Sequence, residues 1–424
     1  MSHVRVPGDK SLTHRALMLA ALATGRSRVN RPLVGADTQS TADALRALGC
    51  PIPPLRADGD VVIDGRGLRG LGGAAAAIDC GNSGTTTRLL MGILAGYPFG
   101  TTLTGDASLR SRPMRRVTTP LAAMGARFEE LGEADRLPIR ISGGALRAIT
   151  YDSPHASAQV KSAILLAGLV GGVDVTVSEP LPSRDHTERM LRRLGVPVRS
   201  EEVTGDGSRV SLTPVEGIDA FDFDVPGDFS SAAFIIAWAA LHARTPVRIE
   251  GVGLNPGRTG FLDVFRRMGG LVDVQDVRES CGEPVGDVVV SASMLRATNI
   301  RGDEIPALVD EVPAIAVLAA RAAGTTTITG AGELRVKESD RITAVVRNLR
   351  AIGVEAEELA DGMVVHGTGR PLAGRVNPLH DHRIAMAFGL LAGGPDAGIT
   401  IDDPGVVAVS YPEYWTTLSM LQSS

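Results

Sequence analysis

The chain has 424 residues with 44% hydrophobic, 21% charged and only 4% aromatic side chains, and a formal net charge of −5 at pH 7. This length exceeds a single ordinary core and predicts two domains of about 200 residues each, while the negative charge argues against nucleic acid as the main partner. Three cysteines without CxxC spacing indicate neither a disulfide framework nor a zinc site, no apolar run approaches the ~20 residues of a membrane span, and we expect a soluble cytoplasmic protein.

Taken in chain order, one pattern recurs: a helix of small apolar residues, a Gly or polar break, and a short β-branched strand. It occupies residues 16–29, 89–103, 163–175, 233–247, 314–327 and 385–399. The strand anchors of successive copies lie 72 to 80 residues apart. Six units of β-α-β-α-β-β type therefore fill the chain, and a solenoid is the less favoured alternative because solenoid repeats are usually shorter.

A second helix follows in five of the units, and it is amphipathic and closes on glycine. These segments are 42–49, 120–125, 187–195, 261–269 and 345–353. Glycine after a basic last turn is a helix C-cap signal. The first helix of each unit is apolar nearly all round and should be buried, whereas the second should be exposed on one face. The pattern predicts an α/β protein with helices inside and sheets outside, an inside-out α/β barrel in each of two domains.

The phrase Val-Pro-Gly-Asp occurs at residues 6–9 and returns at 225–228, 219 residues later. Each copy marks the start of a group of three units. We therefore expect one domain from residues 1–8 plus 227–424, a second from 9–226, a hinge near residues 8 and 226, and an active site in the cleft between the domains. Only the first copy is followed by Lys10, Ser11 and Arg15, so the turn itself does not require these side chains.

Polar side chains gather at the starts of the buried helices. The first helix start carries Lys10, Ser11 and Arg15, and the segment 79–88 (DCGNSGTTTR) brings two glycines and four hydroxyls to the second. Residues 106–113, 157–162 and 183–187 add arginine, amide and hydroxyl groups. Basic groups and helix N-termini together favour anions. Taken singly, an ordinary N-cap or a solvated loop is an open alternative for each segment.

Acidic residues accompany the basic ones in the last two units. Asp310 and Glu311 open one apolar helix, and Asp381, His382 and Arg383 open another. The spacing of Lys337 and Arg341 predicts one helix start on which both share a face, with Glu338 beside them. Acids among cations can transfer protons. The combination indicates an enzyme acting on two phosphorylated or carboxylated metabolites.

Six motifs carry a resemblance to a known family. VPGDKSLTHRAL, GNSGTTTR, SAQVKSA, SRDHTERML, ELRVKESDR and NPLHDHRIAM are similar to EPSP synthases, the 3-phosphoshikimate 1-carboxyvinyltransferases, in order from residue 4 to about 415. The resemblance implies transfer of the enolpyruvyl group of phosphoenolpyruvate to the 5-hydroxyl of shikimate 3-phosphate in the shikimate pathway of aromatic amino acid biosynthesis. It also implies addition and elimination through a tetrahedral intermediate, release of phosphate, no metal or cofactor, and glyphosate as an inhibitor. We also expect a monomer.

The resemblance assigns site residues motif by motif. For shikimate 3-phosphate these are Lys10, Ser11, Arg15, Ser157, Ala158, Gln159, Arg184, Asp310 and Lys337. For phosphoenolpyruvate they are Lys10, Gly84, Arg112, Gln159, Arg341 and Arg383. Asp310 and Glu338 are the expected proton-transfer residues, and Lys10 supports the oxygen that changes charge. Two positions depart from the family pattern, because many relatives have a second serine where Ala158 stands and some have a lysine where Val409 stands.

Three alternatives differ from this interpretation. A sister transferase acts on UDP-N-acetylglucosamine, but it typically has Asn where Ser11 stands and a Cys in the loop that here reads TGDASLRSRP. An RNA-end-processing enzyme built from related repeats would need a basic surface, which the net charge of −5 disfavours. A non-catalytic binder would be expected to lose its acids or arginines, yet Asp310, Glu338, Arg341 and Arg383 are all present.

Overall fold

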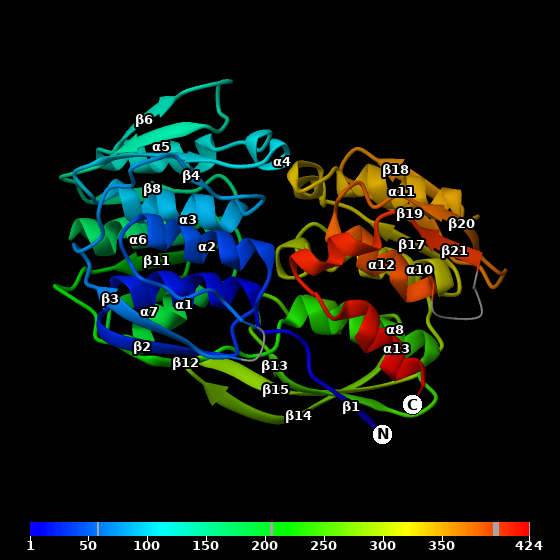
Figure 1. Ribbon diagram of the computed structural model, residues 1–424. Coiled ribbons are helices and arrows are strands. Elements are labelled where there is room, and N and C mark those ends of the chain that lie inside the picture. The colour runs from blue at the N-terminus through cyan, green and yellow to red at the C-terminus, as the bar shows by residue number, and fades with distance from the viewer. Residues whose placement is uncertain (57–58, 204–206, 393–397, 424) are drawn as a thin grey trace. The chain divides into compact units, whose positions relative to one another are not determined.

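The chain divides into two compact units (Figure 1). The computed structural model describes residues 1–56, 59–203, 207–392 and 398–423, so residues 393–397 of the last repeat lie outside the described part. Unit 1 comprises Met1–Pro7, Pro226–Glu279 and Pro284–Ser424, and unit 2 comprises Gly8–Val225 and Ser280–Glu283. Each unit has its own hydrophobic core.

Unit 2 is built around three buried helices: α1 (Lys10–Leu22), α3 (Gly84–Ala95) and α6 (Ala158–Gly171). Helix α3 contacts both of the others, and Figure 1 shows it beside α6. The remaining helices are α2 (Ala36–Ala47), α4 (Ala107–Arg110), α5 (Arg115–Met124) and α7 (His186–Arg193). Beyond their polar first turns, α1, α3 and α6 are apolar on all sides, and these parts of the helices are buried on every face, as the sequence predicts.

Three sheets belong to unit 2. The first has the order β12 (Asp222–Asp224), β2 (Thr24–Asn30), β3 (Val61–Arg66). The second is β4 (Ile78–Asp79), β5 (Gly100–Thr104), β7 (Ile139–Ser142), β6 (Arg127–Glu130). The third is β10 (Val198–Glu202), β11 (Ser208–Leu212), β9 (Val175–Glu179), β8 (Ile149–Asp152). Each sheet holds one parallel pair and at least one antiparallel pair. In the second and third sheets the parallel strands flank a buried helix in the chain, whereas in the first sheet α2 lies between the antiparallel strands β2 and β3.

Unit 1 repeats this plan with buried helices α8 (Phe229–His242), α10 (Val312–Arg321) and α12 (His382–Ala392), each of which contacts the other two. The more exposed helices are α9 (Gly260–Arg267), α11 (Arg341–Ala351) and α13 (Tyr414–Gln422). Short 3₁₀ turns are η1 (Ile305–Ala307), η2 (Gly332–Val336) and η3 (Pro404–Val409). The structure is thus a mixed α/β protein in both units.

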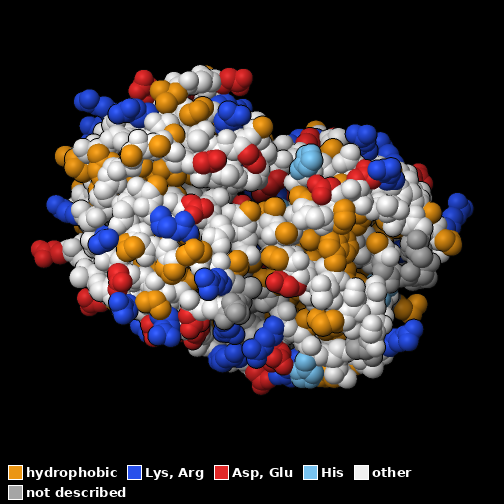
Figure 2. All heavy atoms as spheres, viewed as in Figure 1, with side chains coloured by type: hydrophobic (Ala, Val, Ile, Leu, Met, Phe, Trp, Pro, Cys, Tyr) orange, Lys and Arg blue, Asp and Glu red, His pale blue; other side chains and the backbone are white. Residues whose placement is uncertain are grey.

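The sheets of unit 1 follow the same pairing. The first has the order β1 (Ser2–Val4), β13 (Val247–Gly253), β15 (Glu283–Ser291), β14 (Leu271–Ser280). The second is β16 (Asn299–Ile300), β17 (Thr325–Ile328), β19 (Gly362–His366), β18 (Ala356–Leu359). The last has only β20 (Ala373–Val376) parallel to β21 (Gly398–Ile401) among the described residues. On the face drawn in Figure 2, Lys and Arg side chains are interspersed with Asp and Glu.

The two Val-Pro-Gly-Asp segments are where the chain passes between the units. Strand β1 precedes α1 in sequence but pairs with β13 of unit 1, and β12 precedes α8 but pairs with β2 of unit 2. Both segments build the same turn, because the carboxylate of Asp9 accepts from Leu12 N (2.8 Å) and that of Asp228 accepts from Ser231 N (3.0 Å). The duplicated phrase therefore encodes a helix N-cap at a strand-to-helix crossing.

The predicted glycine caps are confirmed. Gly49, Gly125, Gly195, Gly269 and Gly353 all have positive φ, between 79° and 116°. Each stands just after an exposed helix, where the left-handed conformation stops the helix at no steric cost to glycine.

One local prediction is wrong: Lys337 and Arg341 do not lie on one helical face. Lys337 follows the 3₁₀ turn η2 in an extended conformation. Helix α11 begins only at Arg341, because the carboxylate of Asp340 accepts from Thr343 N (3.1 Å) and caps the helix there.

No helix of the described residues is long and apolar enough to cross a bilayer. The described part of the chain also holds no group of three or more His, Cys, Asp or Glu side chains arranged to bind a metal ion.

Candidate active site

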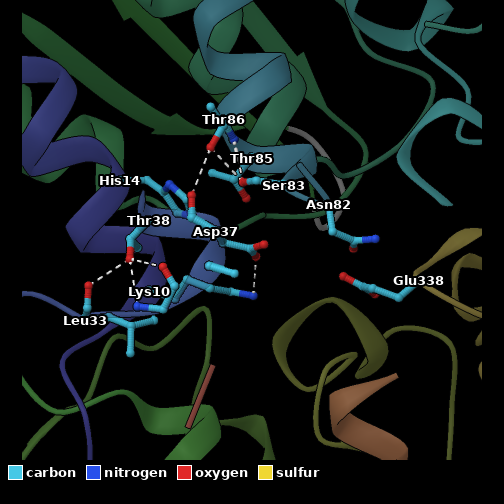
Figure 3. Close-up of polar contacts among 12 residues, drawn as sticks. Lys10, His14, Leu33, Asp37, Thr38, Asn82, Ser83, Thr85, Thr86 and Glu338 are labelled. Carbon is cyan, nitrogen blue, oxygen red and sulfur yellow. Dashed lines mark hydrogen bonds and ion pairs between the residues drawn. The ribbon is translucent and has the colours of Figure 1, made fainter. Parts of the chain in front are cut away.

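In unit 2, Lys10 stands in the first turn of α1 beside the start of α2. Its Nζ lies 2.9 Å from Asp37 Oδ2, and both side chains are mostly buried (Figure 3). The other oxygen, Asp37 Oδ1, has no hydrogen-bond partner among the described residues. The pair places an ammonium group and a carboxylate together at two helix N-termini, where the positive helix ends favour an additional anion.

Arg15 lies deeper in α1 and joins three helices. Its Nε donates to Thr187 Oγ1 (2.7 Å), its Nη2 to Ser162 Oγ (2.9 Å) and its Nη1 to the carbonyl of Ser11 (2.9 Å). Burial lowers the pKa of Arg15 to about 10, and the nearby charge of Arg184 also lowers it. The side chain stays protonated at neutral pH and holds Ser11 in place, while Arg184 is partly buried in the loop before α7.

Two arginines converge on Gly84, the first residue of α3. A Cβ atom there would lie 3.1 Å from Arg88 Nη1 and 3.4 Å from Arg112 Nη1. Arg112 Nη2 donates to Asn82 Oδ1 (2.6 Å), which fixes the guanidinium over the loop. The N-terminus of α3 and two guanidinium groups thus surround one position that only glycine leaves open, an arrangement suited to a carboxylate or phosphate.

Gln159 connects this loop to α6. Arg88 Nη1 donates to Gln159 Oε1 (2.6 Å), and Gln159 Nε2 donates to Thr85 Oγ1 (3.1 Å). Arg88 contacts Gln159 and lies beside Gly84 and Arg112. The three residues that the resemblance assigns to phosphoenolpyruvate, Gly84, Arg112 and Gln159, therefore lie close together.

The start of α6 is held by buried charges. Ser157 caps the helix, with Ala158 as its first residue, and its own N–H donates to Glu179 Oε1 (2.7 Å). Lys161 Nζ lies 2.8 Å from Glu179 Oε2 and 2.9 Å from Glu188 Oε1. Burial disfavours the charged lysine, but the two carboxylates outweigh it and raise the pKa of Lys161. Lys161 therefore supports the Ser157 turn from inside the protein.

In unit 1, Arg341 is the centre of a cluster of charges. Its Nε lies 2.8 Å from Asp381 Oδ2, its Nη2 2.6 Å from Glu338 Oε2 and its Nη1 3.3 Å from Asp310 Oδ1. Burial opposes the charge, but the three carboxylates raise the pKa of Arg341 above its ordinary value. The guanidinium is thereby kept charged and fixed in orientation although only 1% of its side chain is exposed.

Asp310 lies between two guanidinium groups, because Arg383 Nε is 3.6 Å from Asp310 Oδ1. Arg383 Nη1 also donates to the Asp310 carbonyl (3.3 Å). Burial lowers the pKa of Lys337, an effect that Asp310 and Glu333 partly offset. One charged cluster is thus formed by Asp310, Lys337, Glu338, Arg341 and Arg383.

Asp381 is the residue that orients this cluster and that sequence reasoning did not include in the site. It is fully buried and also accepts from Ser339 Oγ (3.0 Å) and Arg383 N (2.9 Å). The only sequence signal was its position in the DHR start of an apolar helix. Asp37, Asn82 and Arg88 were missed in the same way, since each makes its decisive contact with a residue distant in sequence.

Comparison with known proteins decides which family has this arrangement. The family model of EPSP synthase (3-phosphoshikimate 1-carboxyvinyltransferase) matches residues 1–418. The chain belongs to the EPSP synthase family. It is therefore a transferase, and this membership favours EPSP synthase over the sister transferase, the RNA-processing enzyme and the non-catalytic binder.

Relatives in the EPSP synthase family match over the full length. A 3-phosphoshikimate 1-carboxyvinyltransferase of Geobacillus kaustophilus is 48% identical over 421 residues, covering 99% of this chain and 97% of the relative. The enzyme of that name from Sulfurihydrogenibium is 45% identical, covering 98% and 96%. The solved EPSP synthase of Acinetobacter baumannii has a TM-score of 0.84 at 40% identity, covering 99% and 95%.

A more distant solved structure shares the fold. The enolpyruvyl transferase NikO from Streptomyces tendae has a TM-score of 0.74 at 19% identity and covers 99% of this chain and 94% of its own. At this identity the likeness concerns the fold alone.

Proposed function

We propose that the chain transfers the enolpyruvyl group of phosphoenolpyruvate to the 5-hydroxyl of shikimate 3-phosphate and releases phosphate, as a step of aromatic amino acid biosynthesis. The observation that carries the proposal is the family match over residues 1–418. The clusters around Lys10 and Arg341 support it, because both substrates are multiply anionic and both clusters hold cations beside carboxylates.

Shikimate 3-phosphate is assigned to the helix starts of α1 and α6 together with residues of unit 1. The proposed ligands are Lys10, Ser11, Arg15, Ser157, Ala158, Gln159, Arg184, Asp310 and Lys337. The Ser157 turn is supported by Glu179 and Lys161, so its N-terminal N–H groups are presented on a fixed backbone. Because Ala158 carries no hydroxyl, its contribution to phosphate binding is limited to its backbone N–H.

Phosphoenolpyruvate is assigned to Lys10, Gly84, Arg112, Gln159, Arg341 and Arg383. Arg341 and Arg383 are proposed to bind its carboxylate, since guanidinium groups match carboxylates in a bidentate manner. Val409, at the end of η3, offers no cation to its phosphate. The convergence of Arg88 and Arg112 on Gly84 supports a phosphate site there instead.

The proposed chemistry is an addition followed by an elimination. The 5-hydroxyl loses a proton and its oxygen bonds to C2 of phosphoenolpyruvate, while C3 gains a proton. The tetrahedral intermediate then loses a proton from C3 and phosphate from C2, which restores the double bond. Asp310 and Glu338 are the proposed proton-transfer groups, and Lys10 is proposed to stabilise the oxygen that gains or loses charge. Neither a metal ion nor a cofactor enters this proposal.

The finer architecture is proposed in the same terms. Three repeats around buried helices in each unit support an inside-out α/β barrel. The proposed domains are 1–8 plus 227–424 and 9–226, with a hinge near residues 8 and 226 and substrates bound by residues of both. We also propose that the protein is a cytoplasmic monomer and that glyphosate inhibits it.

The deciding experiment measures phosphate release from phosphoenolpyruvate. We expect turnover with shikimate 3-phosphate and none with UDP-N-acetylglucosamine. A protein that turns over neither substrate, or only the second, would contradict the proposed function. Arg383→Ala should lower kcat/KM by about 30- to 900-fold, which is the roughly 2–4 kcal/mol of one positioned electrostatic contact.

A further inference from the structure

A series of hydrogen bonds between buried side chains runs from α1 through α2 to the start of α3. Figure 3 shows His14, Ser83 and Thr86, three of its four members. His14 lies one turn after Lys10, and its Nδ1 is 2.6 Å from Thr41 Oγ1 of α2. Thr41 Oγ1 is 2.6 Å from Thr86 Oγ1 of α3, and Thr86 Oγ1 donates to Ser83 Oγ (2.7 Å). The four side chains are almost fully buried and lie on three separate helices of unit 2 and the loop at Ser83.

His14 carries a single proton on its ring. Burial lowers its pKa well below the ordinary value, and the charges of Lys10 and Arg15 lower it further. The other ring nitrogen, Nε2, is buried and has no hydrogen-bond partner among the described residues. A buried N–H without an acceptor is more costly than a lone pair without a donor. The proton therefore belongs on Nδ1, where Thr41 accepts it.

With the proton on Nδ1, every hydrogen bond in this series is donated in the same direction, from His14 towards Ser83. Nδ1–H donates to Thr41, the Thr41 hydroxyl donates to Thr86, and the Thr86 hydroxyl donates to Ser83. The alternative acceptor for Thr86, the carbonyl of Asp37, is more distant at 3.4 Å. Ser83 Oγ also accepts from Thr86 N (3.1 Å), so both of its lone pairs are occupied. The Ser83 hydroxyl can then act only as a donor.

We propose that His14 is a positioning residue that, through Thr41 and Thr86, commits the Ser83 hydroxyl to donate to an anionic group of phosphoenolpyruvate beside Gly84. Ser83 immediately precedes Gly84, around which Arg88 and Arg112 converge. This inference rests on the proposed function, and it adds a hydroxyl donor to the cations, the Gln159 amide and the backbone N–H groups already assigned to phosphoenolpyruvate. His14 itself touches no substrate.

Kinetic measurements on variants test whether this series of hydrogen bonds positions the Ser83 hydroxyl. Ser83→Ala should raise KM for phosphoenolpyruvate by about 10- to 150-fold, the value of one hydrogen bond to a charged group, with KM for shikimate 3-phosphate nearly unchanged. Thr41→Val keeps the side-chain shape but breaks the chain, and should raise the same KM at least about fivefold. His14→Leu should behave like Thr41→Val, whereas His14→Asn retains a donor near Nδ1 and should stay near wild type. Thr176→Val is a control from sheet strand β9, where the Thr176 hydroxyl is hydrogen-bonded to Ser211, and it should change neither KM.

The double variant Thr41→Val/Ser83→Ala separates positioning from general damage. If Thr41 acts through the Ser83 hydroxyl, the double variant should bind phosphoenolpyruvate no more weakly than Ser83→Ala alone. Additive losses, or equal rises in both KM values, would overturn the proposal. A wild-type protein without turnover would instead contradict the proposed function.

A spectroscopic measurement is independent of activity. With ¹⁵N-labelled histidine, the His14 signals, assigned by their loss in His14→Asn, should show a neutral ring protonated at Nδ1 at pH 7. Protonation at Nε2 would overturn the direction of the chain even if the kinetic variants lose activity.

Discussion

Asp381→Asn tests whether the buried carboxylate holds the Arg341 guanidinium in place. Asp381 accepts a short hydrogen bond from Arg341 Nε (2.8 Å) and a long one from Nη2 (3.4 Å). One hydrogen bond to a charged group contributes about 1.5–3 kcal/mol, and breaking a buried ion pair costs about 3–5 kcal/mol. Glu338 and Asp310 remain 2.6 and 3.3 Å from Arg341, so part of the compensation survives. We expect a loss of about 2–3 kcal/mol, or roughly 30- to 160-fold in kcat/KM for phosphoenolpyruvate.

The assay is steady-state phosphate release with shikimate 3-phosphate saturating. Asp340→Asn is the matched control, because Asp340 also precedes a helix and pairs with an arginine, Arg335, at 2.7 Å, but both side chains are partly exposed. Asn caps helices as well as Asp does, so this control should change kcat/KM less than about threefold. If Asp381→Asn is no more impaired than Asp340→Asn, Arg341 is positioned without Asp381 and the reasoning fails.

Three further predictions concern other parts of the site. Gly84→Ala should weaken glyphosate inhibition more than phosphoenolpyruvate binding, because the new methyl group presses on Arg88 and Arg112; equal inhibition constants in variant and wild type would reject this. Lys161→Met should lower the free energy of unfolding by about 3–5 kcal/mol in urea titration, because two buried carboxylates lose their counterion, and adding Glu188→Gln should restore part of the loss. Since burial lowers the pKa of Lys337, kcat/KM should fall on the alkaline side below the ordinary lysine pKa of about 10.4. Lys337→Arg should move that fall to higher pH, and an unmoved profile would assign it to another group.

The elements that the sequence predicted correctly depend on local signals. Each of the five glycine caps is encoded by a glycine after an amphipathic helix, and the buried helices by uninterrupted small apolar residues. The repeated Asp at positions 9 and 228 caps a helix within three residues of itself. Such signals involve neighbours in the chain, so composition and spacing suffice to detect them.

The partners that the sequence could not predict are distant in the chain. Lys10 and Asp37 are 27 residues apart, and Arg341 and Asp381 are 40 apart. Tertiary packing alone brings such pairs together. The error at Lys337 has a local cause, because the four-residue spacing to Arg341 suggested one helix, whereas Asp340 caps the helix and its first residue is Arg341. Candidate ligands were therefore recognisable by type, but the carboxylates that orient them were not.

The pairing of β1 with β13 also determines the order in which the protein can be completed during synthesis. Residues Ser2–Val4 are translated long before their partners Val247–Ile249. Residues 8–225 form one continuous segment that is translated before β13 exists. The N-terminal strand must therefore wait, unpaired, while most of unit 2 emerges. A deletion of the first seven residues would consequently remove an edge strand from the unit that contains the C-terminus, although these residues adjoin unit 2 in sequence.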